Sequence, residues 1–322
     1  MDVPSGFSGV VRVDRAGAVI LADAHGLANR AWGVPNTVAT RFAMASGSKG
    51  FTALVVARLV EDGVLRWDTR ARTLLGGDLP LIDDEVTVEQ LLAHRSGIGD
   101  YFDEDAGLDI NDYVLPVSMH ELAETEQFLA VLDGFPAKFA PWERFAYCNG
   151  GFVVLALLAE RAATKPFHEL VRDLVTEPAG MHDTAYLRSD ELPGGVALGY
   201  LDGLRTNVFH LPVRGSGDGG CYTTAADMVA FWRALFAGAI VREATLATMI
   251  EPRSDVPSEK LRYGLGFWLA GTGDAVLLEG YDAGVSFRSK HDPTSDTTYT
   301  VLANTSEGAW PVVRELDALG AR

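Results

Sequence analysis

A serine and a lysine three residues apart, Ser46 and Lys49, are the first residues in the sequence whose types and spacing indicate chemistry. Residues at positions i and i+3 lie on one face of a helix, so the Ser46 hydroxyl and the Lys49 amine can approach each other. Serine is a weak nucleophile until a neighbouring base takes its proton, and lysine becomes such a base when burial lowers its pKa. The spacing predicts a nucleophilic serine that is activated by Lys49. The structural alternative is that Ser46 or Ser48 caps the helix and Lys49 lies in solvent.

A tyrosine and an asparagine form a second candidate pair, Tyr147 and Asn149, directly before an apolar segment. A tyrosine near a lysine can move a proton between a nucleophile and a leaving group. An asparagine amide can orient a substrate carbonyl. The structural alternative is that Tyr147 packs at the start of a helix and Asn149 caps it. We interpret Cys148, which lies between them, as a small buried hydrophobic residue rather than a nucleophile.

Other catalytic templates are absent from the sequence. There is no Gly-x-Ser-x-Gly, so the nucleophile elbow of the α/β-hydrolases is excluded. His120-Glu121 is followed by Glu124 where a zinc-protease helix needs a second histidine. No phosphate-binding loop or dinucleotide fingerprint is present, and we interpret the seven histidines as structural. The sequence therefore predicts neither a metal nor a cofactor.

Composition limits the kind of partner and compartment. The chain has 322 residues and a formal charge of −17, from 27 Lys and Arg against 44 Asp and Glu. This acidity argues against nucleic acid or an anionic membrane as the partner and is neutral about small substrates. Residues 1–7 show no signal peptide, and the apolar segment Gly150 to Ala159 is too short to span a bilayer. We expect a soluble, cytoplasmic protein as given, or a secreted or periplasmic one if a leader has been removed.

The two cysteines, Cys148 and Cys221, do not indicate a disulfide scaffold in a chain of this size. A single bridge between them stays open. The sequence does not indicate the oligomeric state.

The elements that must position Ser46 and Tyr147 follow from hydrophobic periodicity and turn residues. The helix from Ser46 to Gly63 shows one apolar stripe, which predicts packing against the first hairpin. The segment Gly151 to Ala163 is apolar almost all round and predicts a buried helix. Further predicted helices are Val86 to His94, His120 to Leu132, Phe167 to Thr176, Thr224 to Phe236 and Trp310 to Leu319. Predicted strands are Phe7 to Val13, Ala18 to Ala24, Tyr263 to Ala270, Ala275 to Glu279, Val285 to His291 and Thr297 to Ala303.

Strands at both ends of the chain with helices between them predict a split α+β fold. An antiparallel sheet flanked by helices would combine the first hairpin with the last strands. Residues 1–70 and 205–322 would form this sheet domain, and residues 71–204 would be an inserted, mostly helical domain. The default place for a site is the cleft between the two.

Five segments in this order resemble the β-lactamase and penicillin-binding-protein superfamily, in particular its class C-like branch with family VIII esterases and D-aminopeptidases. They are FAMASGSKGFTA at residues 42–53, LLAHRSGI at 91–98, FAYCNGGF at 145–152, EPAGM at 177–181 and GGCYTTAAD at 219–227. The resemblance covers nearly the whole chain. It implies that Ser46 is the acylated nucleophile, Lys49 its activating partner and Tyr147 a general acid and base. Which of Lys49 and Tyr147 takes the first proton stays open.

The third motif of the family, Lys-Thr-Gly or His-x-Gly on a strand, is altered in this chain. Counting back from Gly284 places it at Leu278-Glu279-Gly280, so only the glycine matches. The resemblance implies that Gly280 allows close backbone approach and that the N–H groups of Ser46 and Tyr281 form the oxyanion hole. Glu279 either adds a negative charge near the site or is a solvent-facing strand residue.

The missing cation at position 278 leads us to expect weak or no activity on anionic β-lactams. An esterase acting on small neutral esters is the first expectation, with Asn149, Gly280 and Tyr281 binding the substrate. A D-amino-acid amidase or aminopeptidase, or a β-lactamase, is the alternative. An inactive binding or scaffold protein is the alternative of another class. Further candidates for lining the acyl pocket are Asp100, Tyr101, Tyr222 and Trp310.

Overall fold

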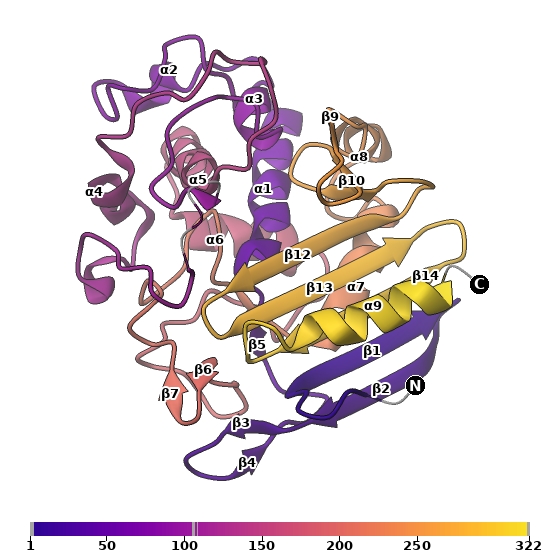
Figure 1. The fold of residues 1–322 in the computed structure, drawn as a ribbon. Coiled ribbons are helices and arrows are strands. Elements are labelled where there is room, and N and C mark those ends of the chain that lie inside the picture. The colour runs from indigo at the N-terminus through magenta and orange to yellow at the C-terminus, as the bar shows by residue number, and fades with distance from the viewer. Residues whose placement is uncertain (1–2, 105–106, 108, 321–322) are drawn as a thin grey trace.

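The computed structural model describes residues 3–104, 107 and 109–320. Its main feature is an eight-stranded antiparallel sheet with the strand order β2-β1-β14-β13-β12-β11-β10-β9 (Figure 1). The N-terminal β1 lies between its hairpin partner β2 and the C-terminal β14, with a register from Gly9 opposite Ala303 to Arg15 opposite Thr297. The α+β fold built from both chain ends is therefore confirmed. The sheet strands are β1 (Gly9–Arg15), β2 (Ala18–His25), β9 (Ser254–Val256), β10 (Leu261–Tyr263), β11 (Trp268–Ala270), β12 (Val276–Asp282), β13 (Val285–Asp292) and β14 (Thr297–Ala303).

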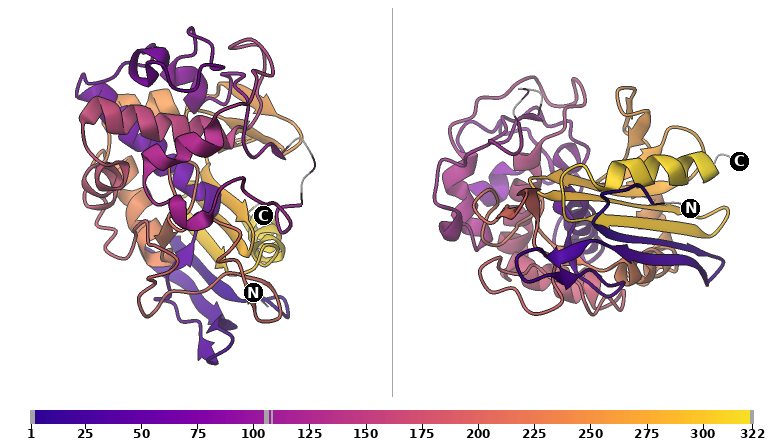
Figure 2. Two further views of the ribbon diagram at one scale, coloured as in Figure 1. Left: turned by 90° about the vertical axis from the view of Figure 1, so that its left-hand side faces the viewer. Right: turned by 60° about the horizontal axis from the view of Figure 1, so that its bottom comes forward.

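Helices cover both faces of this sheet (Figure 2). Successive residues of β13 point to opposite faces, which allows the two sides to be told apart. Arg288 donates to Asp317 of α9 (Ala309–Gly320), whereas Ser289 accepts from the Trp232 indole of α7 (Ala225–Phe236). One face thus carries α9, and the other carries α7 and the larger helical part of the molecule.

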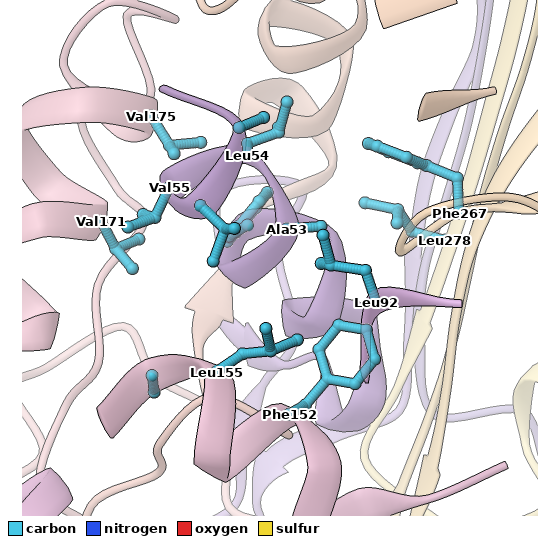
Figure 3. Close-up of a cluster of buried hydrophobic side chains, with 14 of the residues drawn as sticks. Ala53, Leu54, Val55, Leu92, Phe152, Leu155, Val171, Val175, Phe267 and Leu278 are labelled. Atoms are coloured by element: carbon cyan, nitrogen blue, oxygen red, sulfur yellow. The ribbon is translucent and has the colours of Figure 1, made fainter. Parts of the chain in front are cut away.

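The helix after the candidate nucleophile, α1 (Lys49–Glu61), is the centre of the core (Figure 3). Its residues from Lys49 to Ala57 are all buried, so the predicted single apolar stripe is wrong. Its packing against the first hairpin stays a prediction. Apolar side chains surround it because it lies between the sheet and other helices. Neighbouring side chains include Leu278 from β12, Leu92 from α3 (Val88–Leu92), Phe152 from α5 (Asn149–Ala163) and Val171 from α6 (Phe167–Val171).

The remaining segments are shorter than the sequence predicted in two places. The helix expected from His120 to Leu132 is broken into three short pieces, and the strand expected from Tyr263 to Ala270 is interrupted at residues 264–267. Gly266 has a φ of +83°, which a strand does not accept, and this explains the interruption. The other elements are β3 (Leu27–Asn29), β4 (Val34–Pro35), β5 (Phe42–Ala43), η1 (Ala45–Ser48), α2 (Arg72–Leu75), η3 (Met119–Glu121), η4 (Thr125–Phe128), α4 (Leu129–Leu132), the π-helical η5 (Arg172–Thr176), β6 (Tyr200–Asp202), β7 (Arg205–Thr206), β8 (Tyr222–Thr223) and α8 (Glu243–Met249).

The other predicted helices and strands form with shifts at their ends, and α5 is buried as its composition predicts. Domain boundaries at residues 70 and 204 stay a prediction. Among the described residues, no helix is both long and apolar enough to cross a membrane.

Candidate active site

The turn that carries Ser46 is held by a short two-stranded pairing. β5 pairs with β8, and the Met44 amide donates to the Cys221 carbonyl at 2.9 Å. Ala45 then takes a φ of +44°, a left-handed conformation that is unfavourable for a residue with a side chain. This sharp turn starts η1 and α1, and it leaves Ser46 half-buried at the edge of a cavity.

Lys49 is buried and has three oxygen partners. Its Nζ lies 2.9 Å from Ser46 Oγ, 2.8 Å from Asn149 Oδ1 and 2.7 Å from the Asp218 carbonyl oxygen. The side chain is 2% exposed, so the alternative of a solvated lysine is wrong. Burial lowers the pKa of Lys49, and the negative charges of Asp218 and Glu104 oppose that shift.

The three partners of Lys49 differ in what they can donate. The Asn149 and Asp218 oxygens are carbonyls and only accept, whereas the Ser46 hydroxyl can also donate. A neutral amine has two N–H groups and one lone pair. The two N–H groups match the two carbonyls, and the lone pair is left for the Ser46 proton. The contact set therefore suits a lysine that accepts a proton from Ser46.

Tyr147 lies against the same two residues. Its ring centroid is 4.9 Å from Lys49 Nζ, and its phenol is near enough to Ser46 for the serine hydroxyl to influence the pKa of Tyr147. The ring is stacked on Trp268 at 6.1 Å and contacts the His94 ring at 4.3 Å. Burial raises the pKa of Tyr147 well above its ordinary value, which outweighs the opposite effect of the Ser46 hydroxyl. The phenol is thus protonated at neutral pH and able to donate.

Asn149 opens α5, but the cap of this helix is its neighbour. The Cys148 thiol accepts from the Gly151 amide at 3.3 Å, so the alternative of Asn149 as a cap is wrong. The Asp100 carboxylate accepts from the Asn149 amide at 2.6 Å and the Gly150 amide at 2.8 Å. An anion at a helix N-terminus is stabilised by about 0.3–1 kcal/mol. Burial has the larger effect and raises the pKa of Asp100 to about 6.

The side chain of Asn149 is fixed from both ends. Its Oδ1 accepts from Lys49, and its Nδ2 donates to the Phe102 carbonyl and to Glu104 Oε1, both at 3.1 Å. Cys148 and Cys221 are both buried and free, so no bridge joins them. The structure thus brings Ser46, Lys49, Tyr147 and Asn149 together as the sequence predicted.

Strand β12 passes directly behind the nucleophile. A Cβ placed on Gly280 would lie 2.1 Å from the Met44 carbonyl oxygen and 3.0 Å from the Ser46 amide nitrogen. Only glycine allows this approach, which supports the placement of the altered third motif at residues 278–280. Tyr281 follows on the strand, and its side chain is 41% exposed and hydrogen-bonds with Glu307.

The two residues before Gly280 face opposite sides of the sheet. Leu278 is buried against α1, where a Cβ on Gly50 would lie 2.4 Å from its Cδ2. Glu279 forms an ion pair with Arg288, and its side chain is only 24% exposed. The alternative of a solvent-facing Glu279 is therefore wrong, and the neighbouring guanidinium compensates its charge.

Two cavities flank Ser46, and Tyr281 and Glu104 border both. The inner cavity has a volume of about 100 Å³ and mainly apolar walls. The outer cavity has a volume of about 380 Å³ and includes Tyr147. The inner walls include Ala43, Tyr101, Phe102, Ile110, Tyr113, Leu115, Leu187, Val208, Leu211, Pro212, Val213 and Tyr222. The outer walls include Arg144, Phe145, Val256, Ser258, Glu259, Trp268 and Glu279.

Carboxylates give the inner cavity its charge. Glu104, Asp218 and Asp282 line it, and none of the described residues in its walls is a lysine or arginine. Tyr101 donates its hydroxyl to the Asp218 carboxylate. Burial raises the pKa of Asp218, and it raises the pKa of Asp282 to about 7, with the Asp218 charge contributing in the same direction.

Of the four further candidates for lining the acyl pocket, two line a cavity and two do not. Tyr101 and Tyr222 line the inner cavity, whereas Asp100 accepts a hydrogen bond from the first amide of α5. Trp310 lies on the α9 side next to the Tyr281 ring, with centroids 6.3 Å apart, and is not among the residues that line either cavity.

Sequence reasoning missed several residues that border the candidate site. Asp218 provides the carbonyl for Lys49 and lines the inner cavity, and Arg144 lines the outer cavity. The rings of His94 and Trp268 both contact the Tyr147 ring. Asp218 directly precedes the Gly219-Gly220 segment, and His94 belongs to the LLAHRSGI segment, so both had a signal in the sequence.

The comparison with protein families gives one match over nearly the whole chain. The family described as Beta-lactamase matches residues 5–321. Among curated proteins, the esterase EstB of Burkholderia gladioli is 32% identical over 209 residues, which cover 60% of this chain and 50% of EstB. A D-aminopeptidase of Brucella anthropi is 29% identical over 279 residues, which cover 84% of this chain and 51% of that protein. The chain thus spans about half the length of these relatives.

A solved structure matches along nearly the full chain. The penicillin binding protein from Bacillus halodurans superposes with a TM-score of 0.90 and 37% identity, covering 97% of each chain.

Proposed function

Because this chain belongs to the beta-lactamase family, whose members are serine hydrolases, we propose that it hydrolyses an acyl substrate through an acyl-enzyme on Ser46. The observation that carries the proposal is the contact set of Lys49 Nζ, with two carbonyl acceptors and the Ser46 hydroxyl within 2.9 Å. A buried amine arranged in this way has its lone pair directed to the hydroxyl that must lose a proton.

The reaction follows from the positions of these groups. Lys49 takes the Ser46 proton as Oγ attacks the substrate carbonyl, and the N–H groups of Ser46 and Tyr281 stabilise the oxyanion. Tyr147, whose pKa is raised by burial, donates a proton to the leaving group as its bond to the acyl carbon breaks. Water then attacks the acyl carbon and gives a proton to the Tyr147 phenolate, and Ser46 Oγ leaves with the proton that Lys49 returns.

The two cavities take the two parts of the substrate. Tyr147 must reach the leaving group, and it lines the outer cavity. The leaving group therefore belongs in the outer cavity and the acyl group in the inner one, where the Asn149 amide lies. The inner cavity has mainly apolar walls, which fit an acyl chain of modest size.

The first substrate class is a small neutral ester. Leu278 replaces the cation of the third family motif and is buried against α1, so it offers a substrate carboxylate no partner. In the outer cavity, Arg144 is accompanied by Glu104 and Glu259, while Arg288 compensates the charge of Glu279. Anionic β-lactams should accordingly be poor substrates. EstB, at 32% identity, is an esterase of the same family.

The second substrate class carries an ammonium on the acyl group, as in a D-amino-acid amide. The observation that favours it is the set of carboxylates Glu104, Asp218 and Asp282 in the inner cavity, which no described lysine or arginine in its walls offsets. A bound ammonium would balance their charge. The related D-aminopeptidase is consistent with this class.

Acyl transfer from short p-nitrophenyl esters tests the proposal. We expect a burst or steady turnover by the wild-type chain, labelling of Ser46 by a phosphonate, and loss of both in Ser46→Ala. Ser295→Ala, on the β13–β14 turn, is the control and should match the wild type. If the wild type neither turns over esters nor is labelled, the chain is an inactive binding or scaffold member. Turnover retained in Ser46→Ala would rule out the nucleophile.

A matched pair of anilides separates the two substrate classes. Alanine p-nitroanilide and isobutyryl p-nitroanilide differ only by an ammonium in place of a methyl group. Preference for the alanine compound, in one enantiomer, would favour the amine-bearing class, and preference for the isobutyryl compound would favour the neutral class. Nitrocefin in the same series measures any β-lactamase activity.

A further inference from the structure

His94 is a buried histidine that contacts both the backbone and the ring of Tyr147. Its side chain is 1% exposed, and it lies just after α3 with a φ of +54°. Its ring centroid is 4.3 Å from that of Tyr147 and 4.9 Å from those of Phe152 and Tyr263. The imidazole is thus part of the aromatic packing that surrounds the Tyr147 phenol.

Two hydrogen bonds tie His94 to the residues on either side of Tyr147. The Ala146 amide donates to the His94 carbonyl at 2.9 Å, and the Cys148 amide donates to His94 Nδ1 at 3.1 Å. The chain at Tyr147 is thus held at both flanking peptides by one residue. A rotation of the Tyr147 backbone would have to break one of these bonds.

The tautomer of His94 follows from these contacts. Nδ1 accepts a hydrogen bond from the Cys148 amide, so the ring proton is on Nε2. Nε2 is buried and has no hydrogen-bond partner. Burial lowers the pKa of His94 well below its ordinary value, and the charge of Lys49 acts in the same direction. A neutral ring is what the acceptor role requires. An orphaned buried N–H and a left-handed backbone are both unfavourable, and neither improves packing by itself.

We propose that His94 is a positioning residue for the hydrolysis, and that it holds the Tyr147 phenol at the distance from Ser46 needed to protonate the leaving group. The inference rests on the proposed function. His94 itself does not contact the substrate. Its effect reaches the reaction through the Ala146 and Cys148 amides and the ring contact with Tyr147.

The reaction step affected is the breaking of the bond between the acyl carbon and the leaving group. An alkoxide or anilide leaves only if it receives the Tyr147 proton, whereas p-nitrophenolate is stable enough to leave without it. A displaced Tyr147 should therefore slow alkyl esters and leave p-nitrophenyl esters less affected. A misplacement of about 1 Å can cost about a hundredfold in rate.

Two substitutions separate the ring contact from the backbone bond. In His94→Asn the side-chain Oδ1 can accept from the Cys148 amide in the place of Nδ1, and asparagine tolerates positive φ. In His94→Phe the aromatic contact is kept and the acceptor is lost. His291→Asn is the matched control, because His291 is also buried, has an Nδ1 bond to Thr298 and is stacked on Trp232 in the sheet, away from both cavities.

The measurement is kcat for a p-nitrophenyl ester and an ethyl ester with the same acyl group, together with the Tm of each variant. We expect His94→Phe to raise the ratio of kcat for the p-nitrophenyl ester to kcat for the ethyl ester about tenfold or more, with KM nearly unchanged. His94→Asn should restore the ratio to within about threefold of the wild type. His291→Asn should lower Tm without changing the ratio.

An unchanged ratio in His94→Phe, or equal changes in His94→Phe and His291→Asn, would overturn the inference. The same holds if His94→Asn is as impaired as His94→Phe. These results leave the proposed function intact as long as Ser46→Ala is inactive. Turnover by Ser46→Ala would remove the proposed function instead, so the two failures are distinguishable.

Discussion

At the scale of single residues, Lys49 is suited to act as a base because it is buried, whereas a surface lysine would stay protonated at neutral pH. Its amine is buried among acceptors, and the same burial lowers the pKa of Lys49. The acids around the inner cavity oppose this shift, because their charge stabilises the ammonium. The reactivity of Ser46 is thus a balance between desolvation and the charges that also shape the inner cavity.

Replacing Lys49 by methionine tests its role as the base. Lys49→Met keeps the length of the side chain but removes the amine, and we expect kcat/KM for a p-nitrophenyl ester to fall by about 10²–10⁴-fold. In the wild type, the neutral amine is the active form, so kcat/KM should rise with pH through the lowered pKa of Lys49. Lys290→Met, which loses an ion pair with Asp317 on the α9 side, should keep both the rate and the pH profile.

Asp282 offers a test of charge selection in the inner cavity. Asp282→Asn removes one carboxylate at nearly constant volume. If the wild type prefers alanine p-nitroanilide over its isobutyryl analogue, we expect this preference to fall about fivefold, as for about 1 kcal/mol of lost attraction. Asp274→Asn, on an exposed turn, is the control. An unchanged preference in Asp282→Asn would show that the ammonium does not lie near this carboxylate.

At the scale of elements, the position of Ser46 depends on how closely β12 approaches η1. Gly280 permits that approach, and Gly47 allows the Phe287 ring to pack beneath the turn, since a Cβ at Gly47 would lie 2.4 Å from it. The strand and the nucleophile turn therefore form one unit. A side chain at either glycine would separate the oxyanion N–H groups of Ser46 and Tyr281.

Gly280→Ala tests this unit. The new methyl group would lie 2.1 Å from the Met44 carbonyl oxygen, which is backbone and has little room to move. We expect kcat to fall by about 10²-fold or more, because an oxyanion donor would be displaced. Gly77→Ala is the control, since nothing lies within 4 Å of a Cβ there. The two variants are compared by burst kinetics and by Tm, and full activity in Gly280→Ala would refute the proposed oxyanion hole.

Sequence periodicity predicted most elements but not their surroundings. The helix after Ser46 shows helical spacing, yet the number of faces it buries depends on α5 and β12, which are distant in sequence. The segment from His120 to Leu132 has helical residues, but the Gln127 side chain bonds to the Ala123 and Glu124 amides and caps a new short helix instead. Local bonds of this kind compete with a longer helix and leave no periodic signal.

At the scale of the whole molecule, the fold was predictable because both chain ends supply strands to one sheet. The pairing of β1 with β14 follows from the strand-rich ends. The four central residues of the candidate site were predictable from their types and their order in the sequence. The residues that surround these four were not. The carbonyl of Asp218 and the imidazole of His94 are recruited by loops whose path no periodicity describes. Contacts of single loop residues depend on tertiary structure.

The acidity of the chain and its buried carboxylates together predict how stability depends on pH. The formal charge is −17, and mutual repulsion grows as carboxylates ionise. Burial raises the pKa of Asp100 to about 6 and that of Asp282 to about 7, from 3.8. The folded chain therefore keeps protons on both groups over a range in which the unfolded chain has released them.

A folded state that binds more protons loses stability as the pH rises, so these two carboxylates lower the free energy of unfolding between about pH 4 and pH 7. The buried histidines His94, His168 and His291 act in the opposite direction below about pH 6.5, because burial lowers their pKa values. The contribution of Asp282 is therefore measured as the difference in Tm between Asp282→Asn and the wild type, which should become more positive from about pH 5.5 to about pH 8. Asp274→Asn, on an exposed turn, is the control. A difference for Asp282→Asn that does not change over this range would show that Asp282 is already ionised in the folded chain at about pH 5.5.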